Sequence, residues 1–202
     1  MSALEIADII GIISFALSGF LIAVHHKLDI LGIIITAFLT ALGGGMARDI
    51  VANKIPYIFT QNLPVILVIC AVLFAIIFKL HKITDLEGKK AFVLSDTIGL
   101  VSFSISGALI ALEVDFNFFG VLLLSLITAI GGGTLRDIIV NRMPAFLISD
   151  FYGSVAIIIA TIVYTLNHFN QITFINLLIT FIFGVCLRLL AYYKQWHLPK
   201  LS

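Results

Sequence analysis

The chain has 202 residues, of which 61% are hydrophobic and only 11% are Asp, Glu, Lys or Arg, with a formal net charge of +1 at pH 7. Soluble domains usually carry about 25% charged residues, so this composition excludes an ordinary water-soluble protein. The near-zero net charge and the scattered basic residues give no indication of nucleic-acid binding.

Apolar segments long enough to cross a bilayer follow one another along the chain. About 20 apolar residues are needed for a helix to span roughly 30 Å of hydrocarbon. Seven such spans are expected, at residues 6–24, 30–53, 62–80, 92–112, 118–141, 148–167 and 171–190. Long continuous apolar runs favour helices over a barrel. We therefore predict an all-α integral membrane protein that forms a single domain over residues 1–202.

The first three spans return as the next three at a constant offset of 88 residues. The stretch LTALGGGMARDIVANKIP at 39–56 reappears as ITAIGGGTLRDIIVNRMP at 127–144. Residues 6–80 and 92–167 thus form two three-helix repeats, and 171–190 is a seventh helix outside the duplication. Because three is an odd number, the second repeat should enter the membrane with the opposite orientation, an arrangement typical of transporters and channels.

Basic residues predict which side of the membrane each loop faces. One side collects Lys27, Lys79, Lys82, Lys89, Lys90, Arg142, Lys194 and Lys200, whereas the other has little beyond Lys54. Cytoplasmic loops are enriched in Lys and Arg. We therefore expect a multi-pass protein of the cell inner (plasma) membrane with its N-terminus outside and its C-terminus in the cytoplasm.

Each repeat carries a glycine triplet about 13 residues into its second span, which is roughly 20 Å along a helix and well inside the bilayer. The triplets are Gly43, Gly44, Gly45 and Gly131, Gly132, Gly133. Glycine costs about 1 kcal/mol in a helix interior, so three in a row favour a kink or a break that exposes backbone polar groups to a pore or binding site. The alternative is that glycines only let helices approach closely.

An adjacent Arg-Asp pair follows each triplet: Arg48-Asp49 and Arg136-Asp137. Charges inside a span are costly and should face protein or a watery cavity. Neighbouring side chains on a helix point about 100° apart. We therefore expect the arginines to pair across the repeats, Arg48 with Asp137 and Arg136 with Asp49. The pairs would line a pore, lock the fold, or do both.

Small hydroxyl side chains recur at equivalent positions of the two repeats: Ser14, Ser18, Thr40 and Ser102, Ser106, Thr128. They would line a hydrated path, or alternatively pack closely and hydrogen-bond to their own helix backbone. Asp8 and Asp96 begin their spans, where a carboxylate stabilises a helix N-terminus, and we expect that role for them.

The twin GGG-x-x-R-D signature, the inverted 3+3 repeat with a seventh helix and the length of about 200 residues resemble one family. It is the prokaryotic branch of the trimeric intracellular cation (TRIC) channels. The resemblance implies a homotrimer among membrane lipids, with a pore for K⁺ and Na⁺ through each protomer and kinks at the two triplets. The same bacterial repeat domain also carries a label as a glycine transporter.

The function expected from the sequence is thus a monovalent cation channel that holds its ions transiently, without a fixed metal site or a cofactor. Its path would run between the first, second, fourth and fifth spans. The rival is a secondary transporter for glycine or a similar small zwitterion. A purely structural membrane protein is a third reading, and motifs of an enzyme are lacking from the sequence.

Overall fold

The computed structural model describes residues 2–82, 85–148 and 151–196, and every regular element in these ranges is helical. Seven longer helices overlap the seven expected spans. They are α1 (Ala3–His25), α2 (Ile30–Val51), α4 (Leu63–Ile77), α5 (Asp85–Glu113), α6 (Phe118–Ile139), α8 (Tyr152–His168) and α9 (Phe174–Tyr193). Two short helices, α3 (Tyr57–Thr60) and α7 (Ala145–Ile148), and a 3₁₀ turn at Leu80–Lys82 complete the set. Residues 149–150 of the sixth expected span and the basic residue Lys200 lie outside the described residues.

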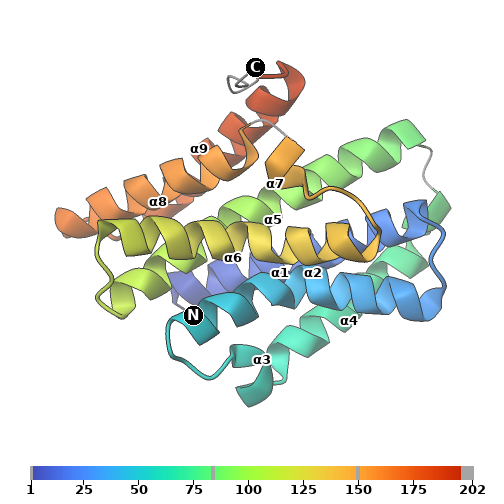
Figure 1. Cartoon of the computed structure of the whole chain (residues 1–202), viewed down its shortest axis with the longest axis horizontal. Helices are drawn as coiled ribbons and strands as arrows, with labels where there is room; N and C mark the ends of the chain where they lie inside the picture. The colour runs from blue at the N-terminus through green and yellow to red at the C-terminus, as the bar shows by residue number, and fades with distance from the viewer. Residues whose placement is uncertain (1, 83–84, 149–150, 197–202) are drawn as a thin grey trace.

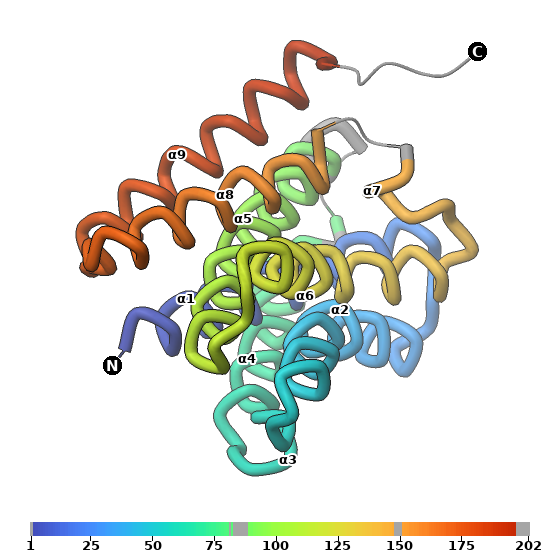
Figure 2. The backbone as a smooth tube through the Cα atoms, turned by 60° about the vertical axis from the view of Figure 1, so that its left-hand side comes forward, coloured from blue at the N-terminus to red at the C-terminus, as the bar shows by residue number. Residues whose placement is uncertain are grey.

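A four-helix centre of α1, α2, α5 and α6 organises the fold. In Figure 1, α4 lies on one side of this centre and α8 and α9 lie on the other. The tube in Figure 2 shows the same arrangement from a second direction. The third helix of each repeat therefore flanks the centre from opposite sides, and α9 packs against α5 and α8.

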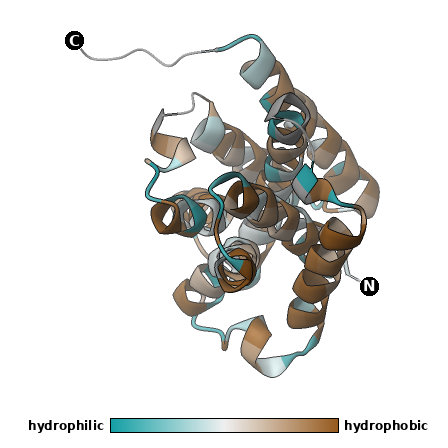
Figure 3. Cartoon of the chain, turned by 90° about the vertical axis from the view of Figure 1, so that its right-hand side faces the viewer, coloured by the Kyte–Doolittle hydropathy of each residue, from teal (hydrophilic) through white to brown (hydrophobic). Residues whose placement is uncertain are grey.

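The surface is apolar, as expected for a protein surrounded by lipid. Figure 3 shows mostly hydrophobic colouring on the outward helix faces and hydrophilic colouring at loops. Five helices (α1, α2, α5, α6 and α9) are long and apolar enough to cross a membrane, while α4 and α8 are shorter apolar helices of 15 and 17 residues. The prediction of an all-helical membrane protein is confirmed.

The second helix of each repeat starts at an equivalent cap. Asp29 Oδ1 accepts a hydrogen bond from Gly32 N at 2.7 Å, and Asn117 Oδ1 accepts one from Gly120 N at 2.9 Å. A side-chain oxygen at this position satisfies a backbone donor that has no partner within the helix. The residues expected at helix starts, Asp8 and Asp96, lie instead inside α1 and α5, so that prediction was wrong.

The predicted breaks at the glycine triplets are also wrong, because α2 and α6 continue as helices through both triplets. The glycines serve the alternative role of close packing. A Cβ on Gly44 would overlap the carbonyl oxygen of Thr128, and a Cβ on Gly132 would overlap that of Thr40. Since any side chain here would separate α2 from α6, glycine is needed for the contact between repeats.

Candidate functional site

Two buried charge clusters lie at equivalent positions of the two repeats. The first cluster contains Asp8, Arg48, Asp49 and Ser106, and the second contains Asp96, Arg136, Asp137 and Ser18. Each cluster takes its arginine and both carboxylates from one repeat and its serine from the other. Six of these residues are site candidates from the sequence, whereas Asp8 and Asp96 were expected only at helix starts.

In the first cluster, one guanidinium bridges two carboxylates. Arg48 Nε donates to Asp49 Oδ1 at 2.8 Å, and Arg48 Nη1 donates to Asp8 Oδ1 at 2.6 Å. Arg48 Nη1 also donates to Ser106 Oγ, whose hydroxyl donates to Asp8 Oδ1 at 2.5 Å. The second cluster repeats this pattern, with Arg136 bonded to Asp137 at 2.9 Å and to Asp96 at 2.5 Å.

These ion pairs correct the predicted pairing of Arg48 with Asp137 and of Arg136 with Asp49. Each arginine instead bonds its own chain neighbour. The Cα–Cβ directions of neighbours do diverge, but an arginine side chain is long enough to fold back so that Nε reaches the adjacent carboxylate. Its Nη1 remains available for the aspartate on the first helix of the same repeat.

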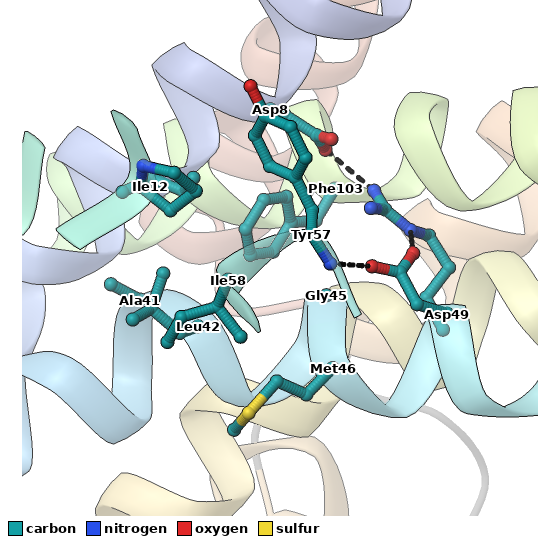
Figure 4. A pocket seen from close by; sticks show the side chains of 12 residues that line it. Asp8, Ile12, Ala41, Leu42, Gly45, Met46, Asp49, Tyr57, Ile58 and Phe103 are labelled. Atoms are coloured by element: carbon teal, nitrogen blue, oxygen red, sulfur yellow. Dashed lines mark hydrogen bonds and ion pairs between the residues drawn. The ribbon is translucent and has the colours of Figure 1, made fainter. Parts of the chain in front are cut away.

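The second aspartate of each pair also fixes the chain after the helix. Asp49 Oδ2 accepts a hydrogen bond from Tyr57 N at 2.9 Å, and Asp137 Oδ2 accepts one from Ala145 N at the same distance. The dashed lines around Asp49 in Figure 4 show this arrangement. Asp49 and Asp137 therefore anchor the N-terminal ends of the short helices α3 and α7.

The remaining hydroxyl candidates have separate positions. Thr40 donates to the carbonyl of Thr36 and Thr128 to that of Leu124, each at 2.6 Å, so both are bonded within their own helices. Ser14 and Ser102 are buried on α1 and α5, one turn before the serines of the clusters. The structure thus brings Ser18 and Ser106 into the clusters, and the other four form no hydrogen bond with a cluster residue in the part of the chain that the structure describes.

An aromatic pair that the sequence analysis missed lies between the repeats. The rings of Phe15 and Phe103 meet edge to face, with centroids 5.3 Å apart, and both are buried. They occupy equivalent positions, and each ring packs on a glycine of the opposite helix, Phe15 on Gly99 and Phe103 on Gly11. Reciprocal contacts of this kind indicate a twofold relation between the repeats.

Open space adjoins the first cluster. A cavity of about 490 Å³ is lined by Asp8, Arg48, Asp49, Glu5 and Lys54 together with apolar residues of α1, α4 and α5. A smaller cavity of about 30 Å³ shares part of this wall and reaches Phe103, which is labelled behind Tyr57 in Figure 4. Water therefore has room beside the first cluster.

The second cluster is covered by aromatic and basic side chains. Arg136 is 0% exposed, its guanidinium lies 4.8 Å from the ring centroid of Phe92, and Tyr152 packs beside it. The guanidinium of Arg188, on α9, lies 4.9 Å from the ring centroid of Tyr152. The sequence analysis missed these residues, although a lone arginine within the span 171–190 was a usable signal, because a charge inside a membrane helix needs a partner.

Comparison with known proteins places this arrangement in a family. A family model described as "Glycine transporter" matches residues 5–81 and 93–168, which are the two repeats. The chain is 32% identical to the UPF0126 membrane protein YvgT of Bacillus subtilis, over 99% of this chain and 97% of that protein. It is 28% identical to the UPF0126 inner membrane protein YadS of Escherichia coli, over 75% of this chain and 72% of that protein.

Solved structures decide the family more specifically. A structure described in connection with conductance through TRIC cation channels is 32% identical, with a TM-score of 0.84 over 98% of this chain and 97% of that chain. A prokaryotic TRIC channel crystallised in 0.5 M KCl is 29% identical, with a TM-score of 0.87 over 96% of this chain and 98% of that chain. The chain belongs to the prokaryotic TRIC family.

A TRIC orthologue from Rhodobacter sphaeroides shares the fold at 23% identity, with a TM-score of 0.88 over 97% of this chain and all of that chain. Together with the membrane-protein relatives and the apolar helices, these matches make the chain a multi-pass TRIC-family membrane protein. The family resemblance stated from the duplicated GGG-x-x-R-D motif is confirmed.

Proposed function

We propose that the protein is a monovalent cation channel that passes K⁺ and Na⁺ along a path between α1, α2, α5 and α6 of each protomer. The seven longer helices would all cross the inner membrane, as inverted repeats 6–80 and 92–167 followed by helix 171–190. The protomers would form a homotrimer among membrane lipids. The relation to TRIC cation channels supports this assignment.

The charge of the clusters is the observation that carries the proposal. Each cluster holds one arginine and two aspartates, so its formal charge is +1 − 2 = −1. A buried site of net negative charge attracts cations and repels anions. One such site in each repeat gives the path two successive sites, and cations that bind weakly at each can move from one to the next.

The orientation follows from the basic residues. With the N-terminus outside, Lys27 and Arg142 face the cytoplasm, in agreement with the positive-inside rule. The first cluster and its cavity then lie toward the outside, and the second cluster lies toward the cytoplasm. Within the glycine triplets Gly43–Gly45 and Gly131–Gly133, Gly44 and Gly132 would hold α2 against α6 beside the path, at the point about which the helices move during gating.

Flux in liposomes tests the proposal. The purified protein should pass K⁺ and Na⁺ but not Cl⁻, without saturating at millimolar concentrations. Asp8→Asn removes a charge that lines the larger cavity, and should lower K⁺ flux and the preference for cations over anions. Asp115→Asn, which neutralises an exposed aspartate that does not line either cavity, is the control and should leave both unchanged. Equal K⁺ and Cl⁻ permeation would contradict a cation channel.

A specific observation favours a second candidate, the transport of glycine or a similar small zwitterion. The larger cavity opens beside one cluster only and places cationic Arg48 and Lys54 near anionic Glu5 and Asp8, a pairing that suits a carboxylate and an ammonium group. The family-model description points the same way. Saturable uptake of labelled glycine without a K⁺ leak would select this function instead.

A further inference from the structure

The third helices of the two repeats differ at one important position. The buried residues of α4 are Pro64, Val68, Ala71, Val72 and Ala75, and those of α8 are Tyr152, Ala156, Ile159, Ala160 and Val163, together with Val155, whose counterpart Leu67 is only partly buried. The two patterns coincide when shifted by 88 residues, which is also the offset of the earlier motifs. Tyr152 therefore stands in the second repeat where Pro64 stands in the first.

In the first repeat this position borders open space. Pro64 lines the smaller cavity together with Gly45, Arg48 and Asp49. A Cβ built on Gly45 would meet nothing within 4 Å. The compact proline ring thus leaves room between the third helix and the first cluster.

In the second repeat the tyrosine side chain occupies the equivalent space. Tyr152 is 2% exposed, and a Cβ built on Gly133 would lie 3.4 Å from Tyr152 Oη and 3.5 Å from Arg136 Nη2. Gly133 is the counterpart of Gly45, so the same helix position is open in one repeat and covered in the other. The space beside Gly45 is therefore open and the space beside Gly133 is filled because the first repeat has Pro64 where the second has Tyr152.

One feature beside Tyr152 favours its movement, and a contact with α9 opposes it. The Tyr152 hydroxyl lies beside Asp96. Arg136 Nη2, next to this hydroxyl, is buried without a hydrogen-bond partner among the described residues, and an unsatisfied buried donor gains hydrogen bonds when it reaches water. The contact that opposes this movement comes from outside the duplication, because Arg188 of α9 packs its guanidinium on the Tyr152 ring.

We propose that Tyr152 is a stopper that closes the second-cluster end of the path while the first-cluster end stays open, and that Arg188 holds it closed. Displacement of the ring exposes Arg136, Asp96 and Asp137 to water and completes the path. This assignment rests on the proposed cation path and adds its gate. It also gives the seventh helix a role, which is to set how firmly the stopper is held.

Thiol labelling tests the stopper without depending on conduction. Gly45→Cys and Gly133→Cys are made in a background with Cys70→Ala and Cys186→Ala, and are treated in vesicles with a membrane-impermeant methanethiosulfonate from either side. Gly45→Cys should react at least roughly tenfold faster than Gly133→Cys, because a thiol must meet water to react. Tyr152→Ala should make Gly133→Cys reactive from the cytoplasmic side, and Pro64→Tyr should protect Gly45→Cys.

Matched variants distinguish a specific effect of the Tyr152 ring from a general loss of packing around α8. Tyr152→Phe keeps the ring and should keep Gly133→Cys protected. Tyr164→Ala, which removes another tyrosine of α8 that packs on Phe118, should also keep it protected. Arg188→Gln should give partial reactivity. If a cysteine at either glycine prevents folding, the labelling rates are compared instead at Met46→Cys and Thr134→Cys, the next equivalent pair along α2 and α6.

The outcomes are distinct. Equal labelling of the two cysteines in the parent, or protection of Gly133→Cys that survives Tyr152→Ala, overturns the stopper. A parent that passes no K⁺ overturns the cation channel but leaves the labelling result intact. If both proposals hold, Tyr152→Ala raises K⁺ flux by roughly tenfold, which corresponds to a barrier lowered by about 1.4 kcal/mol.

Discussion

At the scale of single residues, the two arginines have the same partners but different surroundings. Arg48 is 4% exposed and borders the larger cavity, whereas Arg136 is fully buried beneath Tyr152. Removing one member of a buried ion pair leaves the other charges without compensation. The cost of that removal therefore depends on how much water reaches the charges that remain.

Arg136→Gln should consequently destabilise the protein more than Arg48→Gln. We expect a loss of about 3–5 kcal/mol in the free energy of unfolding for Arg136→Gln, and less for Arg48→Gln, where cavity water solvates the aspartates. Lys54→Gln, in a half-exposed pair with Glu113, should cost at most about 1 kcal/mol. Denaturant unfolding in detergent measures all three. Equal losses at the two arginines would contradict the difference in solvation.

His26, just after α1, gives a prediction for pH. Burial lowers the pKa of His26, the charges of His25 and Arg142 lower it further, and Asp137 acts in the opposite direction. Because the folded state favours the neutral imidazole, its contribution to stability is complete above the unfolded pKa of about 6.5 and is lost as the pH falls below that value. NMR titration should place the His26 midpoint below that of a model peptide, and Arg142→Gln should raise it.

The partners of the two arginines and the role of Asp8 could not be predicted from the sequence. The motif identifies Arg48, Asp49 and their counterparts. The predicted pairing was wrong because the 100° angle between neighbouring Cα–Cβ bonds does not account for the length of an arginine side chain, which can fold back onto the next residue. Asp8 was read as a helix-end residue because its span was expected to begin at residue 6, while α1 begins at Ala3. Its actual role depends on the packing of α1 against α2, which only the tertiary structure provides.

At the scale of helices, the position of each segment was predictable and the behaviour of the glycines was not. Apolar length alone located all seven longer helices, including α4 and α8. Three glycines in a row have weak helix propensity, which favoured a break. In the protein the helix continues, since close contact between α2 and α6 compensates for that weakness. Propensity is a local property, whereas the Thr128 carbonyl that Gly44 contacts belongs to the other repeat, far away in sequence.

A pair of neighbouring glycines tests this explanation. Gly44→Ala should destabilise the protein by about 1–3 kcal/mol, because its methyl group would overlap the Thr128 carbonyl and force α2 away from α6. Gly45→Ala has free space around the new methyl group and should stabilise the helix by up to about 1 kcal/mol. Thermal unfolding in detergent measures both. A stabilising Gly44→Ala would show that the glycines are not needed for the contact.

At the scale of the whole molecule, the duplication predicts opposite exposure of equivalent loops. Ile55 and Met143 are 88 residues apart in sequence, and both are exposed. In the inverted arrangement, Ile55→Cys should react with an impermeant thiol reagent only from outside the cell, and Met143→Cys only from the cytoplasm. The same background without Cys70 and Cys186 serves as the control. Labelling of both positions from one side would contradict inversion.

The difference between the open first cluster and the covered second cluster could not be predicted from the sequence. A repeat is recognised by the residues that its two copies share, whereas Pro64 and Tyr152 differ, and only the burial of α4 and α8 shows that they are equivalent. Arg188 was overlooked for the same reason, as it lies outside the duplication. Family and fold follow from the positions that the repeats share, whereas the proposed closure of the path depends on positions that differ.

The division of contacts between repeats has a consequence for biosynthesis. Each arginine finds both of its carboxylates within its own repeat, while the glycine contacts of α2 and α6 join one repeat to the other. The first three spans can therefore enter the membrane with Arg48 already paired, before the second repeat has been translated. Assembly then needs only the docking of two halves in which each arginine is already paired, so two separate polypeptides divided between residues 82 and 85 should still associate in the bilayer.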